Sequence, residues 1–196
     1  MGTGLLLMLL IGAVSLARDH RYLTDHVVRL HVVANSDSKE DQQRKLQVRD
    51  GITAWLSEQA DSNMTAQQAT QWLQDHLPQL QKVAQDNALA AGCTGAVRVS
   101  FEREAFPMRE YETFSLPSGV YQSLRITLGE GAGKNWWCVV FPSLCLPATT
   151  EDFQDTAVGA GFSEELTDTL TGEKSYEIRF FLLDLLGQLE NFLFRR

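Results

Sequence analysis

The sequence predicts an α+β fold, on two observations. A strand pattern at residues 27–34 is followed by two long helical patterns, and a run of strand patterns then leads to a final helix. Helices grouped together before a run of strands are typical of α+β domains. We therefore expect a single globular domain over residues 18–196. It would contain a mixed or antiparallel sheet of about five strands, with two N-terminal helices and one C-terminal helix packed on it.

The first three elements show clear sequence patterns. Residues 27–34 have the sequence VVRLHVVA, in which alternate apolar side chains fall on one face of a strand. Ser38 is a suitable N-cap for a helix that extends to about Gln59. A capping box at Thr65 begins the second helix, and Pro78 inside its apolar pattern should kink or split it.

Three further strands are predicted in the middle of the chain. Apolar and polar residues alternate around Val97–Phe101 and again over Val120–Leu128. Residues Trp136–Phe141 are apolar throughout, which is typical of a central strand covered on both faces.

The last fifty residues predict three kinds of structure. Residues 147–174 are polar and rich in Thr, Gly and Asp, so we expect a long loop. Tyr176–Phe181 resembles a last strand, and Leu182–Phe194 has the apolar spacing of a helix.

The N-terminus differs from the rest of the chain because residues 5–17 carry no charge. About thirteen apolar residues are short for a membrane span, which needs about 20, but they fit the core of a signal peptide. Small residues at Ser15 and Ala17 would allow cleavage before Arg18. The first four residues, however, lack Lys and Arg. Residues 1–17 are therefore expected to be a signal peptide or a membrane anchor, with a buried core helix as the other alternative.

Three cysteines leave the redox state open. Cys138 and Cys145 are separated by VVFPSL, a segment whose proline could turn the chain and bring the two thiols together. The candidate disulfide is therefore Cys138–Cys145, and the alternative is a pair of buried thiols.

The glycine-rich segment GEGAGKNWWC (129–138) is not a phosphate-binding loop. Such loops require Ser or Thr after the Gly-Lys pair and a following helix, whereas Asn135 and a strand pattern follow here. We expect a connection between two strands, in which glycine allows positive φ. Lys134 and Asn135 would then lie near an exposed tip.

Other function classes find little support in the residues. The formal net charge of −8 argues against nucleic acid as a partner. The four histidines lack metal-binding spacing, and a nucleophile elbow is missing. Paired carboxylates such as Glu164 and Glu165 are usually solvated surface. The residues therefore offer no catalytic set, and we expect no catalytic residue, no cofactor and no metal.

Three segments together resemble the stage II sporulation protein R family of endospore-forming bacteria. They are RLHVVANSDSKEDQQRKLQVRD (29–50), LPSGVYQSLRITLGEGAGKNWWCVVFPSLC (116–145) and YEIRFFLLDLL (176–186). The resemblance implies a non-enzymatic signalling protein, exported from the forespore into the space between forespore and mother cell. Its partner would be a membrane-embedded aspartic protease of the mother cell, which removes the propeptide from the sigma-E precursor.

The glycine-rich tip is our candidate contact with that protease. Tryptophan and cationic side chains are frequent at binding hot spots. The candidate residues are Lys134, Asn135 and Trp136, together with Asn35 and Asp37 of the loop that follows the first strand. The alternatives are that the tip only turns the chain, that the protein is an exported cell-wall-acting hydrolase, or that it is a structural protein tethered through residues 5–17.

Overall fold

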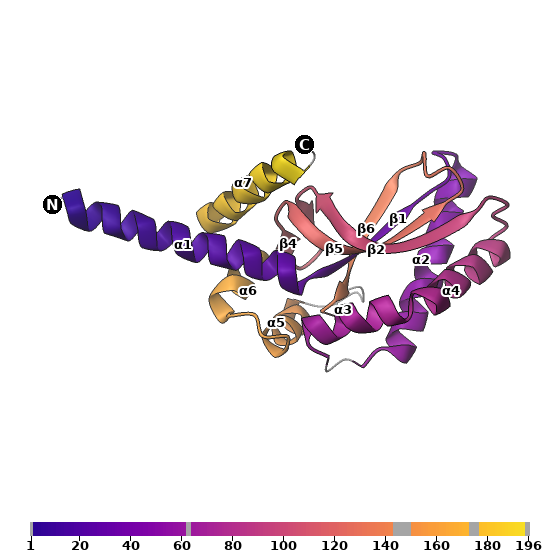
Figure 1. The fold of residues 1–196 in the computed structure, drawn as a ribbon, viewed down its shortest axis with the longest axis horizontal. Helices are drawn as coiled ribbons and strands as arrows, with labels where there is room; N and C mark the ends of the chain where they lie inside the picture. The colour runs from indigo at the N-terminus through magenta and orange to yellow at the C-terminus, as the bar shows by residue number, and fades with distance from the viewer. Residues whose placement is uncertain (1, 62–63, 143–149, 173–176, 195–196) are drawn as a thin grey trace. The chain divides into compact units, whose positions relative to one another are not determined.

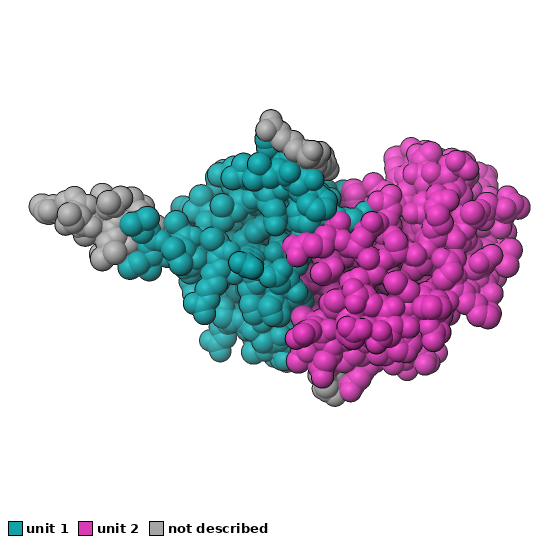
Figure 2. All heavy atoms as spheres, in the orientation of Figure 1, with its two compact units in different colours: residues 1–26, 104–121, 148–196 teal, residues 27–103, 122–147 magenta. Residues whose placement is uncertain are grey.

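A computed structural model of the chain describes residues 2–61, 64–142, 150–172 and 177–194. Figure 2 shows two compact units. Unit 1 comprises residues 1–26, 104–121 and 148–196, and unit 2 comprises residues 27–103 and 122–147. Helices and a mixed sheet occur together, so the predicted α+β class is confirmed. That residues 18–196 form one domain stays a prediction.

A four-stranded mixed sheet has the strand order β2-β5-β1-β6 (Figure 1). The second strand in the chain, β2, spans Val97–Phe106, and β5 spans Gly119–Leu128. The first strand, β1 (Val28–Val33), pairs in parallel with β5 and antiparallel with β6 (Asn135–Phe141). All six residues of β1 are buried, as expected for a strand with a neighbour on each side.

Three helices of unit 2 pack against this sheet. They are α2 (Lys39–Gln59), α3 (Ala66–Asp75) and α4 (Leu77–Ala90). The Ser38 side chain caps α2, and Thr65 forms the predicted capping box of α3 with Gln68. The predicted second helix is two helices because α3 ends just before Leu77-Pro78, where proline begins α4 without loss of a helical hydrogen bond.

The predicted inner face of the first strand lies in the core of unit 2. Val28, Leu30 and Val32 contact a cluster that includes Ile52 of α2 and Leu80 of α4, and all five are at most 1% exposed. Truncating one such buried side chain typically costs about 2–5 kcal/mol. Turning the other face of β1 toward the helices would remove all three side chains from the core, so the apolar alternation determines which face the helices cover.

The expectation that Trp136–Phe141 forms a central strand is wrong. Among the described residues, β6 pairs only with β1 and lies at an edge of the sheet. The strand is apolar because its side chains pack in different ways. Val139 and Phe141 are buried, whereas Trp136 is 36% exposed and its ring packs against the guanidinium group of Arg49.

Unit 1 contains four helices and a short hairpin-like sheet. These elements are α1 (Gly2–His26), β3 (Arg109–Glu110), β4 (Ser115–Leu116), α5 (Thr150–Gly159), α6 (Glu164–Thr171) and α7 (Glu177–Phe194). Within this unit α1 contacts α7, and α6 contacts α5, α7 and β4. Phe114 and Phe153 stack with their ring centroids 4.3 Å apart.

Two predictions for the C-terminal region are wrong. The expected loop over residues 147–174 contains α5 and α6, and the expected strand at Tyr176–Phe181 is the first part of α7 from Glu177 onward. Ser163 caps α6, and Gly172 ends it with φ of 77°. Polar residues in this region therefore occur within helices: Thr167 and Thr169 are buried in α6, and their hydroxyls donate to backbone carbonyls of the preceding turn. The strand prediction at Tyr176–Phe181 is wrong because a short apolar run is compatible with a strand and with a helix.

The N-terminal apolar run lies within α1, which continues to His26. In the part of the chain that the structure describes, no helix is both long enough and apolar enough to span a membrane.

Candidate functional site

The glycine loop, residues 129–134, is held by the loop that follows β1. The backbone N–H of Gly133 donates to Ala34 O at 2.9 Å, and the N–H of Ala132 donates to Asn35 O at 3.1 Å. Two side chains complete the contact: Asn35 Oδ1 accepts from Glu130 N at 3.0 Å, and Asp37 Oδ1 accepts from Lys134 N at 2.7 Å. The structure thus brings together both segments of the predicted contact region.

Glycine is required in this loop for conformation and for space. Gly129 and Gly131 have φ of 56° and 64°, values that other residues rarely adopt. A Cβ atom on Gly129 would lie 2.1 Å from Asn35 Oδ1, and one on Gly133 would lie 2.3 Å from Ser36 O. The three glycines therefore shape the loop to fit closely against residues 34–37, and phosphate binding plays no part in that arrangement.

Asp41, in the first turn of α2, stabilises the supporting loop. Its Oδ2 accepts hydrogen bonds from Ser36 Oγ at 2.7 Å and Asn35 Nδ2 at 2.8 Å, and its Oδ1 accepts from Arg44 at 3.0 Å. The hydrogen bonds from Ser36 and Asn35, followed by the interaction with Arg44, lower the pKa of Asp41 to about 2. The same Asn35 that holds Glu130 is therefore held in turn by a charged carboxylate.

Replacing Asp41 by asparagine is expected to lower the free energy of unfolding by about 1–3 kcal/mol at neutral pH, because charge-assisted bonds are lost. A folded-state pKa of about 2, below the ordinary aspartate value of 3.8, stabilises the fold above about pH 4, and this stabilisation is lost as the pH falls toward 2. Urea unfolding at pH 7 and pH 3 should therefore show a smaller difference between wild type and variant at pH 3.

Asp86→Asn is the matched control, since Asp86 forms an exposed pair with Lys82 and should change stability by at most about 0.5 kcal/mol. An Asp41→Asn penalty of the same size at both pH values would contradict the role given to the ionised carboxylate.

Lys45 of α2 lies beneath the glycine loop as a buried cation. It is only 4% exposed, and its Nζ donates to Lys134 O at 2.9 Å and to Gln42 Oε1 at 2.7 Å. Burial lowers the pKa of Lys45, and the nearby Asp37 opposes this effect. Both backbone polar groups of Lys134 are therefore hydrogen-bonded: its N–H donates to Asp37, and its carbonyl accepts from Lys45.

The predicted contact residues have different roles in the structure. The Lys134 side chain is exposed, and the Trp136 ring is covered in part by Arg49, whose Cζ lies 4.3 Å from the ring centroid. Asn135 is exposed as a residue, but its Oδ1 is joined to His31 Nε2 at 3.0 Å. Asn35 and Asp37 position the loop, and Lys134 and Trp136 are exposed on it.

Sequence reasoning missed Asp41, Lys45 and Arg49 as parts of this site. One signal was available, because Asp41 stands three residues after the Ser38 cap, in the first turn of α2. The spacing of Lys45 and Arg49, four residues apart, places them on the same helix face, but gives no sign that the face meets the glycine loop.

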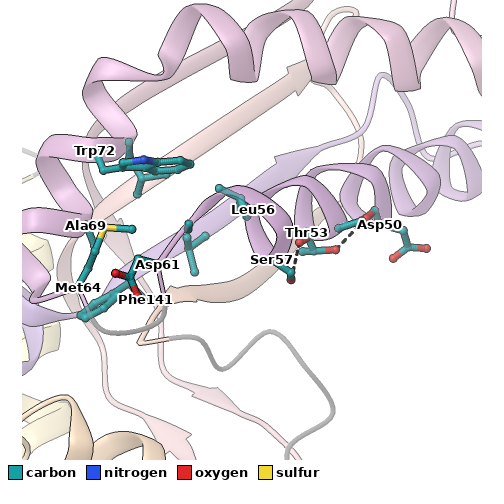
Figure 3. Close-up of a pocket in the computed structure, with 13 residues that line it drawn as sticks. Asp50, Thr53, Leu56, Ser57, Asp61, Met64, Ala69, Trp72 and Phe141 are labelled. Atoms are coloured by element: carbon teal, nitrogen blue, oxygen red, sulfur yellow. Dashed lines mark hydrogen bonds between the residues drawn. The ribbon is translucent and has the colours of Figure 1, made fainter.

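An apolar pocket of about 380 Å³ lies elsewhere in unit 2, between α2, α3 and the end of β6. In Figure 3, Trp72 lies across the pocket from Leu56, and Met64 and Phe141 lie together at one end. Asp50, Thr53 and Ser57 contribute polar groups, but both hydroxyls donate to backbone carbonyls of α2. The pocket can accept an apolar side chain, and its hydroxyl groups are not arranged as activated nucleophiles.

Side chains of the types that bind metals occur throughout the described residues. Within them, His, Cys, Asp and Glu side chains do not gather into a group that could hold a metal ion. Cys93 is a free thiol, and Cys138 is disulfide-bonded. Cys145 lies outside the described residues, so the Cys138–Cys145 pairing stays a prediction.

Comparison with known proteins gives two consistent matches. The family profile described as stage II sporulation protein R matches residues 24–151, a range that includes the glycine loop and its support. Stage II sporulation protein R of Bacillus subtilis (strain 168) is 28% identical over 185 residues, which cover 85% of this chain and 83% of that protein. No solved structure matches the chain. Because the family profile covers more than half of its residues, the chain belongs to the stage II sporulation protein R family.

Proposed function

We propose that this sporulation protein is an exported, non-enzymatic signal that activates a membrane-embedded aspartic protease of the mother cell. Activation would lead to proteolytic processing of the sigma-E precursor. The protein would leave the forespore through residues 1–17, which act as a signal peptide or as an anchor, and would work in the intermembrane space.

Membership of the stage II sporulation protein R family is the observation that carries this proposal. It is supported by the form of the glycine loop. That loop is fixed by four hydrogen bonds to residues 34–37 before any partner arrives. A surface that is already ordered loses less conformational entropy on binding.

Lys134 and Trp136 are the proposed contact groups on this surface. The lysine supplies an exposed cation, which would pair with an acidic group of the protease ectodomain. The Trp136 ring offers a large apolar area next to the Arg49 guanidinium, a combination frequent at binding hot spots. Asn35, Asp37 and Asn135 act indirectly by holding the loop in place.

The test is co-expression of the full chain with the protease and the sigma precursor in a non-sporulating host, with precursor cleavage followed by gel shift. Cleavage should depend on this protein. Lys134→Glu should reduce it by at least about ten-fold, since a charge reversal replaces an attraction by a repulsion.

The matched control is Lys82→Glu, the same change at an exposed lysine of α4, and it should leave cleavage unchanged. Lys134→Glu is a suitable probe because the hydrogen bonds to Asp37 and Lys45 use the backbone of Lys134 and not its side chain. Full cleavage by a correctly folded Lys134→Glu variant would remove the glycine loop from the proposal. No cleavage with the wild-type chain, shown to be exported and folded, would favour a cell-wall hydrolase or a structural tether.

A further inference from the structure

Helix α7 carries its apolar side outward. Its large exposed side chains are each between 40% and 76% exposed, and they recur at intervals of three and four residues. This spacing places them on one face of the helix. We call this face the α7 stripe: Ile178, Phe181, Leu182, Leu185, Leu189, Phe192 and Leu193.

The polar side of α7 faces its own unit. Asp184 Oδ1 accepts from Ser118 N at 2.7 Å, and Glu190 Oε2 accepts from Val120 N at 2.9 Å. Asn191 Nδ2 donates to Phe106 O at 2.7 Å. These hydrogen bonds fix the rotation of the helix, so the outward direction of the α7 stripe is specified by the fold.

This arrangement is the reverse of an ordinary surface helix, which buries its apolar face and hydrates its polar face. Exposed apolar patches larger than a few hundred Å² are rare on soluble monomers, and they mark surfaces that something else covers. The α7 stripe is therefore a binding surface.

The helix that packs against α7 also exposes apolar side chains. In unit 1, α1 packs against α7 and exposes the apolar residues Leu10, Ile11 and Val14. Residues 1–17 of that helix contain no charged side chain. Two adjacent helices thus present apolar side chains to the outside of the same unit.

We infer that the α7 stripe docks on a lipid bilayer, with the helix lying in the membrane interface. Helix α1, which packs against α7, contains the uncharged apolar residues 5–17, so a bilayer would cover apolar side chains of both helices. The four charged residues of α7, two of which bind backbone N–H groups of their own unit, prevent the helix from crossing the membrane, so it would lie along the interface. This surface is separate from the proposed protease contact and does not depend on it.

The net charge of −8 predicts how the chain binds lipid. Apolar burial must supply the affinity, since an acidic chain gains little from anionic headgroups. Binding should therefore occur on neutral phosphatidylcholine vesicles and should be insensitive to salt.

The experiment places an environment-sensitive NBD fluorophore on the α7 stripe of the full chain through Leu189→Cys, in a Cys93→Ala background that removes the free thiol. Leu89→Cys is the matched control, because Leu89 is an exposed leucine on α4. Adding phosphatidylcholine vesicles should shift the emission to the blue at position 189 and leave it unchanged at position 89.

Substitutions give a second readout by vesicle flotation. Leu185→Gln and Leu189→Gln should each weaken partition of the full chain by about three- to ten-fold, since each removes an apolar side chain from the buried area. Leu89→Gln should have no effect.

Three results would overturn the inference. The first is unchanged emission at position 189 in chains bound to vesicles. The second is blue-shifted emission before lipid is added, rising with protein concentration, which would show that a second copy covers the α7 stripe. The third is binding that requires anionic lipid and disappears at high salt.

Discussion

Replacing Gly187 by alanine is expected to destabilise unit 1 by about 3 kcal/mol or more. A Cβ atom at this position would lie 1.6 Å from Ser118 O and 2.2 Å from Ser118 C. Both neighbours are backbone atoms, so the helix itself must move away. That movement breaks the hydrogen bonds of Asp184 and Glu190 to backbone N–H groups, and each unpaired buried group costs about 1–3 kcal/mol.

The higher helix propensity of alanine opposes this effect by only about 1 kcal/mol. Urea unfolding measures the loss, and amide hydrogen exchange over α7 should become faster. Gly12→Ala is the control, since Gly12 also lies inside a helix of unit 1 but its added Cβ would meet no atom within 4 Å. If Gly187→Ala proved as stable as Gly12→Ala, the close approach of α7 to Ser118 would be wrong.

Replacing Gly133 by alanine is expected to abolish signalling while costing about 1–3 kcal/mol of stability. The new Cβ would lie 2.3 Å from Ser36 O and 2.9 Å from the Ala34 side chain, so the glycine loop must separate from its support. Lys134 and Trp136 would then lose their fixed position, because the Gly133–Ala34 hydrogen bond lies directly before them.

Two measurements separate the structural and the functional parts of this prediction. Urea unfolding reports the stability change, and precursor cleavage in the co-expression assay reports signalling. Gly159→Ala is the control, as its Cβ would meet nothing within 4 Å; it should leave cleavage unchanged and raise the stability by at most about 1 kcal/mol. Normal cleavage by a folded Gly133→Ala variant would show that the shape of the glycine loop is irrelevant to signalling.

The strands and caps of unit 2 could be predicted from the sequence because their signals are local. Alternating apolar residues in β1 predict the buried face, and Ser38 and Thr65 predict where α2 and α3 begin. Each signal depends on contacts within a few residues, so no knowledge of the rest of the chain is needed.

The candidate site could be predicted only in part. The order of strand, glycines and strand was sufficient to exclude a phosphate loop and to place Lys134 at an exposed tip. The support from Asn35 and Asp37 joins residues 95 and 97 positions apart, and Lys45 reaches Lys134 across 89 positions. Spacing along the chain carries no information about such contacts.

The α7 helix shows the same division most clearly. By itself, the sequence determines that α7 has an apolar face over Leu182–Phe194, since this follows from a repeat of three and four residues. Only the tertiary structure decides that the face points outward. The direction depends on the backbone N–H groups of Ser118 and Val120, which take up the polar side of the helix. The periodicity of the sequence shows that the two faces of the helix differ in polarity. Which face is buried depends on residues about seventy positions away in the chain.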